Sequence, residues 1–345
     1  MLTGKQLEEI RDHLNNSQNP VFFYDNDADG LCSYVLLRKY IGRGKGVAIR
    51  THPDINVNYV RKVQEFKADC VFVLDKPVLG KEFVEEINKM SVPIVWIDHH
   101  NAGEDYNEVF VYDSSKNIKD NEISEPVTYL CYKVTERKED LWIAMMGCIA
   151  DNFMPDFVDV FSERWSEFYG ENLKVPFDVY YKTEIGLLAR SLAFGLKDSI
   201  THIVELQNFL IKSNSPGEMK SELDSYSAFG KKYRELKKKY DSLILKAKDF
   251  VDDKILFFSY GGDMSMSSEI SNELCYLFPN KIIAVGYDNG GMVNISLRGD
   301  NVREKLEKVL VNFEGATGGG HRNAVGSRIK SSDLELFKEK LKELL

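Results

Sequence analysis

The sequence has few cysteines and no long apolar run. Its five cysteines are scattered along 345 residues, and no two of them form a Cys-x-x-Cys pair. An odd number without such pairs argues against a disulfide framework and is typical of buried thiols in a reducing compartment. No apolar stretch approaches the roughly 18 residues of a membrane-spanning helix, and no signal-peptide pattern opens the chain. We therefore expect a soluble protein of the cytoplasm that does not bind membranes.

An excess of positive charge is also missing, since the formal net charge is −9. Proteins that follow a long phosphate track often have a basic balance, so a surface that binds nucleic acid would have to be local. The stretch 231–248 is the candidate, with eight basic residues against Glu235 and Asp241, and it contains Tyr233 and Tyr240. Charge and stacking of this kind can guide a single strand, although a charged helix between domains is more often a solvated spacer.

The order of apolar runs predicts two α/β domains. The length exceeds the usual domain size of about 100–150 residues. Strand-like runs alternate with helix-like stretches up to about residue 115, which predicts a parallel sheet, and the pattern from about 125 to 212 is mainly helical. We predict an N-terminal domain over 1–195 with a parallel sheet flanked by helices, a helical connector over 196–250, and a smaller C-terminal α/β domain over 251–345.

Acidic residues and histidines follow the apolar runs of the N-terminal part. Open parallel sheets bind ligands at the carboxyl ends of their strands, so four separate segments are predicted to bring these side chains together. The last run, 147–150, can be a strand or a helix. The residues are Asp25, Asp27 and Asp29 after the run 21–24, Asp75 after 71–74, Asp98, His99 and His100 after 93–97, and Asp151 after 147–150.

This pattern predicts a metal centre. Carboxylates held close together raise one another's pKa, a cost that a divalent cation removes. The candidate ligands are numerous enough for two ions, which in such centres lie about 3.5–4 Å apart and activate a water, and Asp75 is the candidate bridge. Mixed carboxylate and imidazole ligation favours Mn²⁺, with Mg²⁺ or Zn²⁺ as alternatives. Taken singly, each aspartate is explained equally well as a helix cap or turn residue. The predicted ligands are Asp25, Asp27, Asp29, Asp75, His99 and Asp151.

At these residues the chain resembles the DHH phosphoesterase superfamily. The first motif of its RecJ-like branch, Asp-x-Asp-x-Asp-Gly, is intact at 25–30, and the Asp-His-His motif is intact at 98–100. Asp75 and Asp151 match the second and fourth motifs. The C-terminal part is similar to the associated DHHA1 domain, whose Gly-Gly-Gly-His signature stands at 318–321.

The resemblance implies a phosphoesterase with two manganese ions, whose active site lies in the cleft between the two domains. It implies catalytic roles for Asp98 and His100, with His100 beside the metal centre or in contact with a phosphate. A glycine-rich loop lets backbone N–H groups approach a phosphate, and an arginine can bind one in bidentate fashion. The predicted substrate-binding residues are Ser296, Arg298, Gly318, Gly319, Gly320 and His321.

Among the phosphoesters that the superfamily hydrolyses, we expect single-stranded DNA or RNA, cut from an end. No histidine lies between residues 14 and 24, where the pyrophosphatase and nanoRNase branches usually have one. The chain leaves no room for an additional oligonucleotide-binding barrel of about 100 residues, which fits the shorter archaeal RecJ-like nucleases.

Two alternatives stay open. One is a nanoRNase-like phosphodiesterase of short oligonucleotides, or of cyclic or linear dinucleotides. The other is a non-catalytic replication scaffold, like the RecJ-like relative of the replicative helicase that has lost its metal ligands. A DNA replication or repair protein is a candidate partner in either case.

Overall fold

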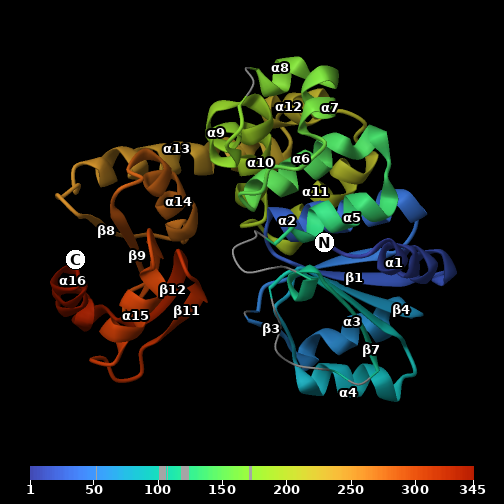
Figure 1. Cartoon of the computed structure of the whole chain (residues 1–345), viewed down its shortest axis with the longest axis horizontal. Coiled ribbons are helices and arrows are strands. Elements are labelled where there is room, and N and C mark those ends of the chain that lie inside the picture. The colour runs from blue at the N-terminus through green and yellow to red at the C-terminus, as the bar shows by residue number, and fades with distance from the viewer. Residues whose placement is uncertain (52, 101–105, 107, 118–123, 171–172) are drawn as a thin grey trace. The chain divides into compact units, whose positions relative to one another are not determined.

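The computed structural model describes residues 1–51, 53–100, 106, 108–117, 124–170 and 173–345. The chain divides into two compact units, Met1–Arg234 and Glu235–Leu345 (Figure 1). The predicted division at residues 195 and 250 stays a prediction. In the part of the chain that is described, no helix has both the length and the apolar character needed to cross a bilayer.

A five-stranded parallel sheet forms the centre of the first unit, as predicted. Its order is β2-β1-β4-β6-β7, and every neighbouring pair runs parallel. Two further short strands, β3 and β5, pair with each other. The bounds are β1 Pro20–Asp25, β2 Lys45–Ile49, β3 Asp54–Ile55, β4 Cys70–Leu74, β5 Val78–Leu79, β6 Ile94–Asp98 and β7 Val109–Asp113.

Helices make up most of the rest of the first unit, and the last of them, α13, continues into the second. The predicted helical character of about 125–212 is confirmed. The α-helices are α1 Gly4–Asn16, α2 Ala28–Ile41, α3 Val60–Phe66, α4 Lys81–Lys89, α5 Val127–Thr135, α6 Leu141–Ala150, α7 Val158–Arg164, α8 Ser166–Tyr169, α9 Pro176–Lys182, α10 Glu184–Gly195, α11 Ile200–Lys212, α12 Pro216–Asp224 and α13 Ala228–Lys248. The 3₁₀ turns are η1 Val57–Tyr59, η2 Ser114–Asn117 and η3 Lys138–Asp140.

Both faces of the parallel sheet are covered, which explains why its strands are almost continuously apolar. Helices α3 and α4 pack on one face, against strand residues that include Phe23 and Trp96. Helix α2 packs on the opposite face, where Tyr34 stacks on Tyr24 with ring centroids 5.3 Å apart (Figure 1). Full burial of each large apolar side chain contributes about 1.5–3 kcal/mol to the free energy of folding. The well-packed sheet therefore holds the residues at the ends of its strands in fixed positions.

The second unit is a smaller α/β fold, as predicted. Its sheet has the order β11-β12-β10-β9-β8, with β8 and β9 parallel and the other pairs antiparallel. Helices α15 and α16 contribute to its apolar core. The bounds are β8 Ile255–Gly261, α14 Ser267–Leu277, β9 Ile282–Asp288, β10 Met292–Arg298, α15 Val302–Leu310, β11 Thr317–His321, β12 Ala324–Lys330, η4 Ser331–Asp333 and α16 Leu334–Glu343.

Candidate metal centre

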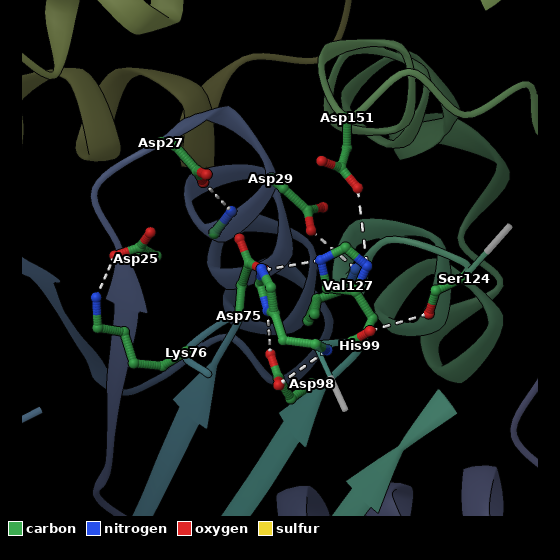
Figure 2. Close-up of polar contacts among 12 residues, drawn as sticks. Asp25, Asp27, Asp29, Asp75, Lys76, Asp98, His99, Ser124, Val127 and Asp151 are labelled. Atoms are coloured by element: carbon green, nitrogen blue, oxygen red, sulfur yellow. Dashed lines mark hydrogen bonds and ion pairs between the residues drawn. The ribbon is translucent and has the colours of Figure 1, made fainter. Parts of the chain in front are cut away.

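Three neighbouring strands bring the predicted ligands to one edge of the sheet. Strands β1, β4 and β6 are adjacent and parallel, so the residues that follow them meet at their carboxyl ends. Figure 2 shows Asp25, Asp75 and Asp98 at these ends, with Asp29 and Asp151 above them. The cluster predicted from the sequence is therefore present as a cluster of side chains.

Asp151 reaches this cluster from a helix. The apolar run before it is the last turn of α6, and the Asp151 N–H donates to the Gly147 carbonyl at 3.2 Å. Helix α6 is apolar on all sides because α2, α5 and α10 surround it. Gly147 allows the close approach to α5, since a Cβ there would lie 2.2 Å from Oγ1 of Thr128.

Asp27 and Asp29 are fixed by the N-termini of two helices. Asp27 caps α2 and accepts a hydrogen bond from the Gly30 N–H at 2.9 Å. Asp29 is 3% exposed and accepts from the N–H groups of Val127 at 2.9 Å and Thr128 at 2.7 Å, at the start of α5. Carboxylates are favoured at helix N-termini, so both residues have a structural role besides any role as ligands.

Asp75 lies in a tight turn directly after β4. Its φ of +58° falls in the left-handed region, which Asp and Asn enter more readily than most residues. The Asp75 N–H donates to the Ile97 carbonyl at 3.0 Å, and the side chain is buried. Within the described chain, Oδ1 of Asp75 has no hydrogen-bond partner. An unsatisfied buried oxygen is costly, and a cation would satisfy it.

The ring of His99 lies between Asp75 and Asp151 (Figure 2). Its Nε2 is 3.4 Å from Oδ1 of Asp75, and its Nδ1 is 3.7 Å from Oδ2 of Asp151. Nδ1 is buried and has no hydrogen-bond partner among the residues described. The His99 carbonyl accepts from Oγ of Ser124 at 3.1 Å, which fixes the backbone beside the ring.

Among the described residues, two groups of three ligand atoms could hold a metal ion, and both contain His99. In each group the atoms lie within 4.8 Å of one another. Carboxylate oxygens with imidazole nitrogens are suitable ligands for Mn²⁺, Mg²⁺ or Zn²⁺, so these residues fit a divalent cation. One group is Asp75, His99 and His100, and the other is Asp29, His99 and Asp151.

Burial and mutual repulsion make the carboxylates of the cluster hard to ionise. Burial, and then the charge of Asp29, raises the pKa of Asp75 well above its ordinary value. Desolvation by the surrounding protein, and then the charge of Asp75, also raises the pKa of Asp27, although this residue is exposed. Desolvation by the surrounding protein also raises the pKa of Asp151 to about 7, although its side chain is 40% exposed and His99 opposes the shift. A bound cation favours the ionised carboxylates, so metal binding is coupled to proton release.

The predicted catalytic pair, Asp98 and His100, is a hydrogen-bonded unit. Asp98 is fully buried, with Oδ1 2.9 Å from Nδ1 of His100 and Oδ2 accepting from the His100 N–H at 3.1 Å. Burial opposes a charge on His100, but the hydrogen bond to Asp98 and the charge of Asp75 outweigh it and raise the pKa of His100 to about 10. Without a bound metal ion, these contacts favour the protonated ring.

Asp25 is paired with a lysine that the sequence analysis missed. Lys76 directly follows Asp75 and is completely buried, and its Nζ lies 2.6 Å from Oδ1 of Asp25 (Figure 2). The Lys76 carbonyl accepts from Nε1 of Trp96 at 2.8 Å. Among the described residues, neither group of three ligand atoms includes Asp25 or Asp27. A lysine next to a motif aspartate was the available signal, but the pairing depends on β1 and β4 being neighbours.

The predicted substrate-binding residues lie in the second unit. Ser296 is buried on β10, and its hydroxyl donates to Oγ of Ser267 at 3.1 Å. Nε of Arg298, at the end of the same strand, donates to Oδ1 of Asn272 at 2.5 Å. Both side chains are thus held by neighbours in their own unit, and their role toward a substrate stays a prediction.

The glycine-rich signature 318–321 forms a strand, so the expectation of a loop was wrong. It belongs to β11, which pairs with β12 and stands at the end of the sheet order. All of Thr317–His321 is exposed. Glycine has low strand propensity, so the pairing with β12 imposes this conformation. An edge strand presents backbone N–H groups on its outer side, and the contact of Gly318, Gly319, Gly320 and His321 with a phosphate stays a prediction.

The tyrosines of the basic stretch 231–248 are not exposed for stacking. The stretch lies in α13, so its helical character is confirmed. Tyr233 is 9% exposed and Tyr240 is 5% exposed, and the Tyr240 hydroxyl donates to Oε2 of Glu273 at 2.6 Å. The idea that these rings guide a single strand was therefore wrong, because they serve packing instead.

Comparison with protein families finds two matches along the chain. The N-terminal domain of the DHH family matches residues 21–150, and the DHHA1 domain matches residues 252–345. The chain belongs to the DHH family and carries a DHHA1 domain. The first match contains the motifs at 25–30 and 98–100, and the second contains 318–321. A search of curated protein sequences gives no significant match.

Solved structures share the fold of this DHH-family chain at low sequence identity. RecJ of Thermus thermophilus in complex with Mn²⁺ gives a TM-score of 0.68 at 14% identity, over 99% of this chain and 55% of that one. This chain thus spans about half the length of the Thermus protein. An exonuclease RecJ bound to manganese gives 0.64 at 14% identity, over 100% and 94%. CDC45 from Entamoeba histolytica gives 0.51 at 9% identity, over 99% and 98%.

Proposed function

We propose that this DHH-family protein is a metal-dependent phosphodiesterase, a hydrolase that removes nucleotides from an end of single-stranded DNA, RNA or both. The proposal depends on one observation: two buried ligand atoms that have no hydrogen-bond partner among the described residues, Oδ1 of Asp75 and Nδ1 of His99, lie within a cluster of carboxylates. Desolvation and repulsion both oppose such a cluster, so it does not serve stability. Binding of a cation at the carboxyl ends of the parallel strands explains why these carboxylates lie together.

In this proposal the centre holds two divalent ions, with Mn²⁺ preferred and Mg²⁺ as an alternative. Asp75 is the candidate bridge between them, and the further ligands come from Asp25, Asp27, Asp29, His99 and Asp151. When bound, the ions supply Lewis acidity, which lowers the pKa of water and offsets the charge of a phosphate. The manganese in two RecJ structures of the same fold supports this choice of metal.

His100 is the residue that we expect to act on the substrate itself. Asp98 fixes the orientation of the ring through Nδ1, and the raised pKa of His100 keeps it charged. Its Nε2 is then a donor for a phosphate oxygen, whose negative charge increases as the phosphodiester is attacked. Asp98 is a positioning residue in this scheme, because it acts through His100.

The second unit supplies the substrate-binding residues in the proposal. The exposed strand that ends at His321 offers backbone N–H groups and an imidazole to a phosphate, and Arg298 with Ser296 offers a further donor set.

A phosphodiesterase of short substrates is the second candidate. The burial of Tyr233 and Tyr240 removes one aromatic surface that could have held a long strand. Substrates of the nanoRNase type, or cyclic and linear dinucleotides, need no such surface. A replication scaffold is the third candidate, supported by the similarity in fold to CDC45. The intact ligand set argues against it, because a scaffold has no use for repelling carboxylates.

Turnover on a panel of substrates separates these functions. Purified protein is incubated with Mn²⁺ and with labelled single strands of DNA and RNA from two to about thirty nucleotides, a range that brackets known single-strand site sizes. Duplex DNA and cyclic dinucleotides are the controls. Stepwise shortening of the long strands is the expected result. Activity only on the shortest substrates would favour the second candidate, and no turnover with any substrate would favour the scaffold.

A further inference from the structure

Lys76 places a fixed positive charge inside the acidic cluster. Its side chain is completely buried, and its Nζ contacts Oδ1 of Asp25 at 2.6 Å. The backbone is held on both sides of this residue. Asp75 before it occupies a left-handed turn, and the Lys76 carbonyl accepts from Trp96. The ammonium group is thus built into the strand ends and is not a mobile surface charge.

A buried ammonium group needs a partner that stays charged. Taking it out of water is costly, and an opposite charge at contact distance offsets that cost. Asp25 fills this role, and its side chain is 28% exposed. The carboxylate of the first motif that lies nearest the end of β1 is therefore already neutralised by the protein's own cation.

The other candidate ligands lie apart from the pair of Asp25 and Lys76. Both groups of three ligand atoms in the described chain contain His99, and neither contains Asp25 or Asp27. Asp27 is engaged as the cap of α2. One region of the cluster thus has carboxylates beside the imidazole rings of His99 and His100, and the other has Asp25 with Lys76.

We infer that Lys76 competes with a metal ion for Asp25, so that the centre binds one divalent cation tightly and a second one much more weakly. The tight ion is held by residues from the set Asp29, Asp75, His99 and Asp151. The weak ion binds at Asp25 and Asp27, and it must displace the Lys76 ammonium to do so. This inference rests on the metal-dependent function proposed above. It implies that the occupancy of the second site, and not that of the first, changes over the range of metal concentrations that the protein meets.

Mn²⁺ titration of the whole chain tests the inference without any substrate. The protein is stripped of metal with a chelator, and binding is followed by calorimetry and by the electron paramagnetic resonance signal of free Mn²⁺. We expect two sites in the unmodified protein, the second about tenfold weaker or more, because a unit positive charge a few ångström away opposes the second ion. Two sites of equal affinity would overturn the inference.

Three variants make the test specific. Lys76→Met keeps the length of the side chain and removes the charge, so the second ion should bind about tenfold more tightly while the first is unchanged. Lys89→Met is the matched control, since Lys89 makes an equally short contact with Glu86, at 2.6 Å, but is 67% exposed on α4. It should leave both sites unchanged. Asp25→Asn should abolish only the second site, and this variant decides the question if Lys76→Met does not fold.

The outcomes separate this inference from the proposed function. An unchanged second site in Lys76→Met, or an unaltered titration in Asp25→Asn, would overturn the role of Lys76 and leave a metal-dependent enzyme intact. Absence of Mn²⁺ binding in every protein of the set would overturn both.

Discussion

Replacing Asp151 with asparagine should stabilise the metal-free protein in the presence of a chelator. It should also reduce the further stabilisation that Mn²⁺ gives. Oxygen atoms of Asp151 and Asp29 lie within 4.8 Å of each other in one of the ligand groups. Asp151 also ends α6, where the helix dipole disfavours a negative charge. Asparagine keeps the shape of the side chain but removes the charge, so the repulsion disappears together with an anionic ligand.

The size of the effect follows from this distance. Two unit charges 4.8 Å apart repel by about 3 kcal/mol at an effective dielectric constant of about 20. The Asp151 side chain is 40% exposed, so water screens much of this, and we expect a gain of about 1 kcal/mol. For a unit of this size the gain raises the melting temperature by about 2–4 °C.

The pH dependence has a definite sign. The pKa of Asp151 is about 7 in the folded protein, above its ordinary value of 3.8, so folding favours the protonated form. The ionised Asp151 side chain therefore lowers the free energy of unfolding most above pH 7, and this destabilisation decreases as the pH falls toward 4. The advantage of the variant should shrink over the same range.

Calorimetric melts at pH 8 and pH 5, each with chelator and with Mn²⁺, measure both effects. Asp156→Asn is the matched control, because Asp156 is 61% exposed and paired with Lys133 outside the ligand groups. The electrostatic reasoning would be refuted if Asp151→Asn melts no higher than the original protein in chelator and if Mn²⁺ raises the melting temperature of both proteins equally.

Two further predictions follow from the same contacts. Asp29→Asn should lower the free energy of unfolding in chelator, because the carboxylate that accepts from two N–H groups of α5 becomes a side chain with one acceptor. The lost hydrogen bond costs about 1–3 kcal/mol, which outweighs the relief of repulsion with Asp151. Melting in chelator checks this, and a gain in stability would contradict the capping role. His321→Ala should raise KM for an oligonucleotide and leave metal content unchanged, since His321 is assigned to substrate binding. Steady-state kinetics with elemental analysis checks it, and loss of metal would contradict the assignment.

The parallel sheet and the cluster at its edge were predictable from the sequence because buried strands leave a plain signature. The run before Asp75 and the run before Asp98 are apolar on both faces, so each is typical of a covered strand that ends at a polar residue. The rule that such strands present ligands at their carboxyl ends then gives the location. The element before Asp151 stayed open because a short apolar run has no period that separates a strand from a buried helix.

Features that depend on neighbours in space were not predictable. The pairing of Lys76 with Asp25 requires the order of β1 and β4, which adjacent residues do not encode. The strand at 318–321 arises from pairing with β12, against the turn preference of glycine. The burial of Tyr233 and Tyr240 follows from what packs on α13, and composition alone cannot show it.

The most direct test of the proposed function is manganese-dependent release of nucleotides from a labelled single strand, by the original protein and by Asp75→Asn side by side. Asparagine tolerates the left-handed turn at this position, so the variant should fold while lacking the charge of the candidate bridging ligand. We predict turnover that needs Mn²⁺ in the original protein and is abolished in the variant. Equal turnover by both proteins, or turnover that persists in chelator, would contradict a metal-dependent phosphodiesterase centred on Asp75.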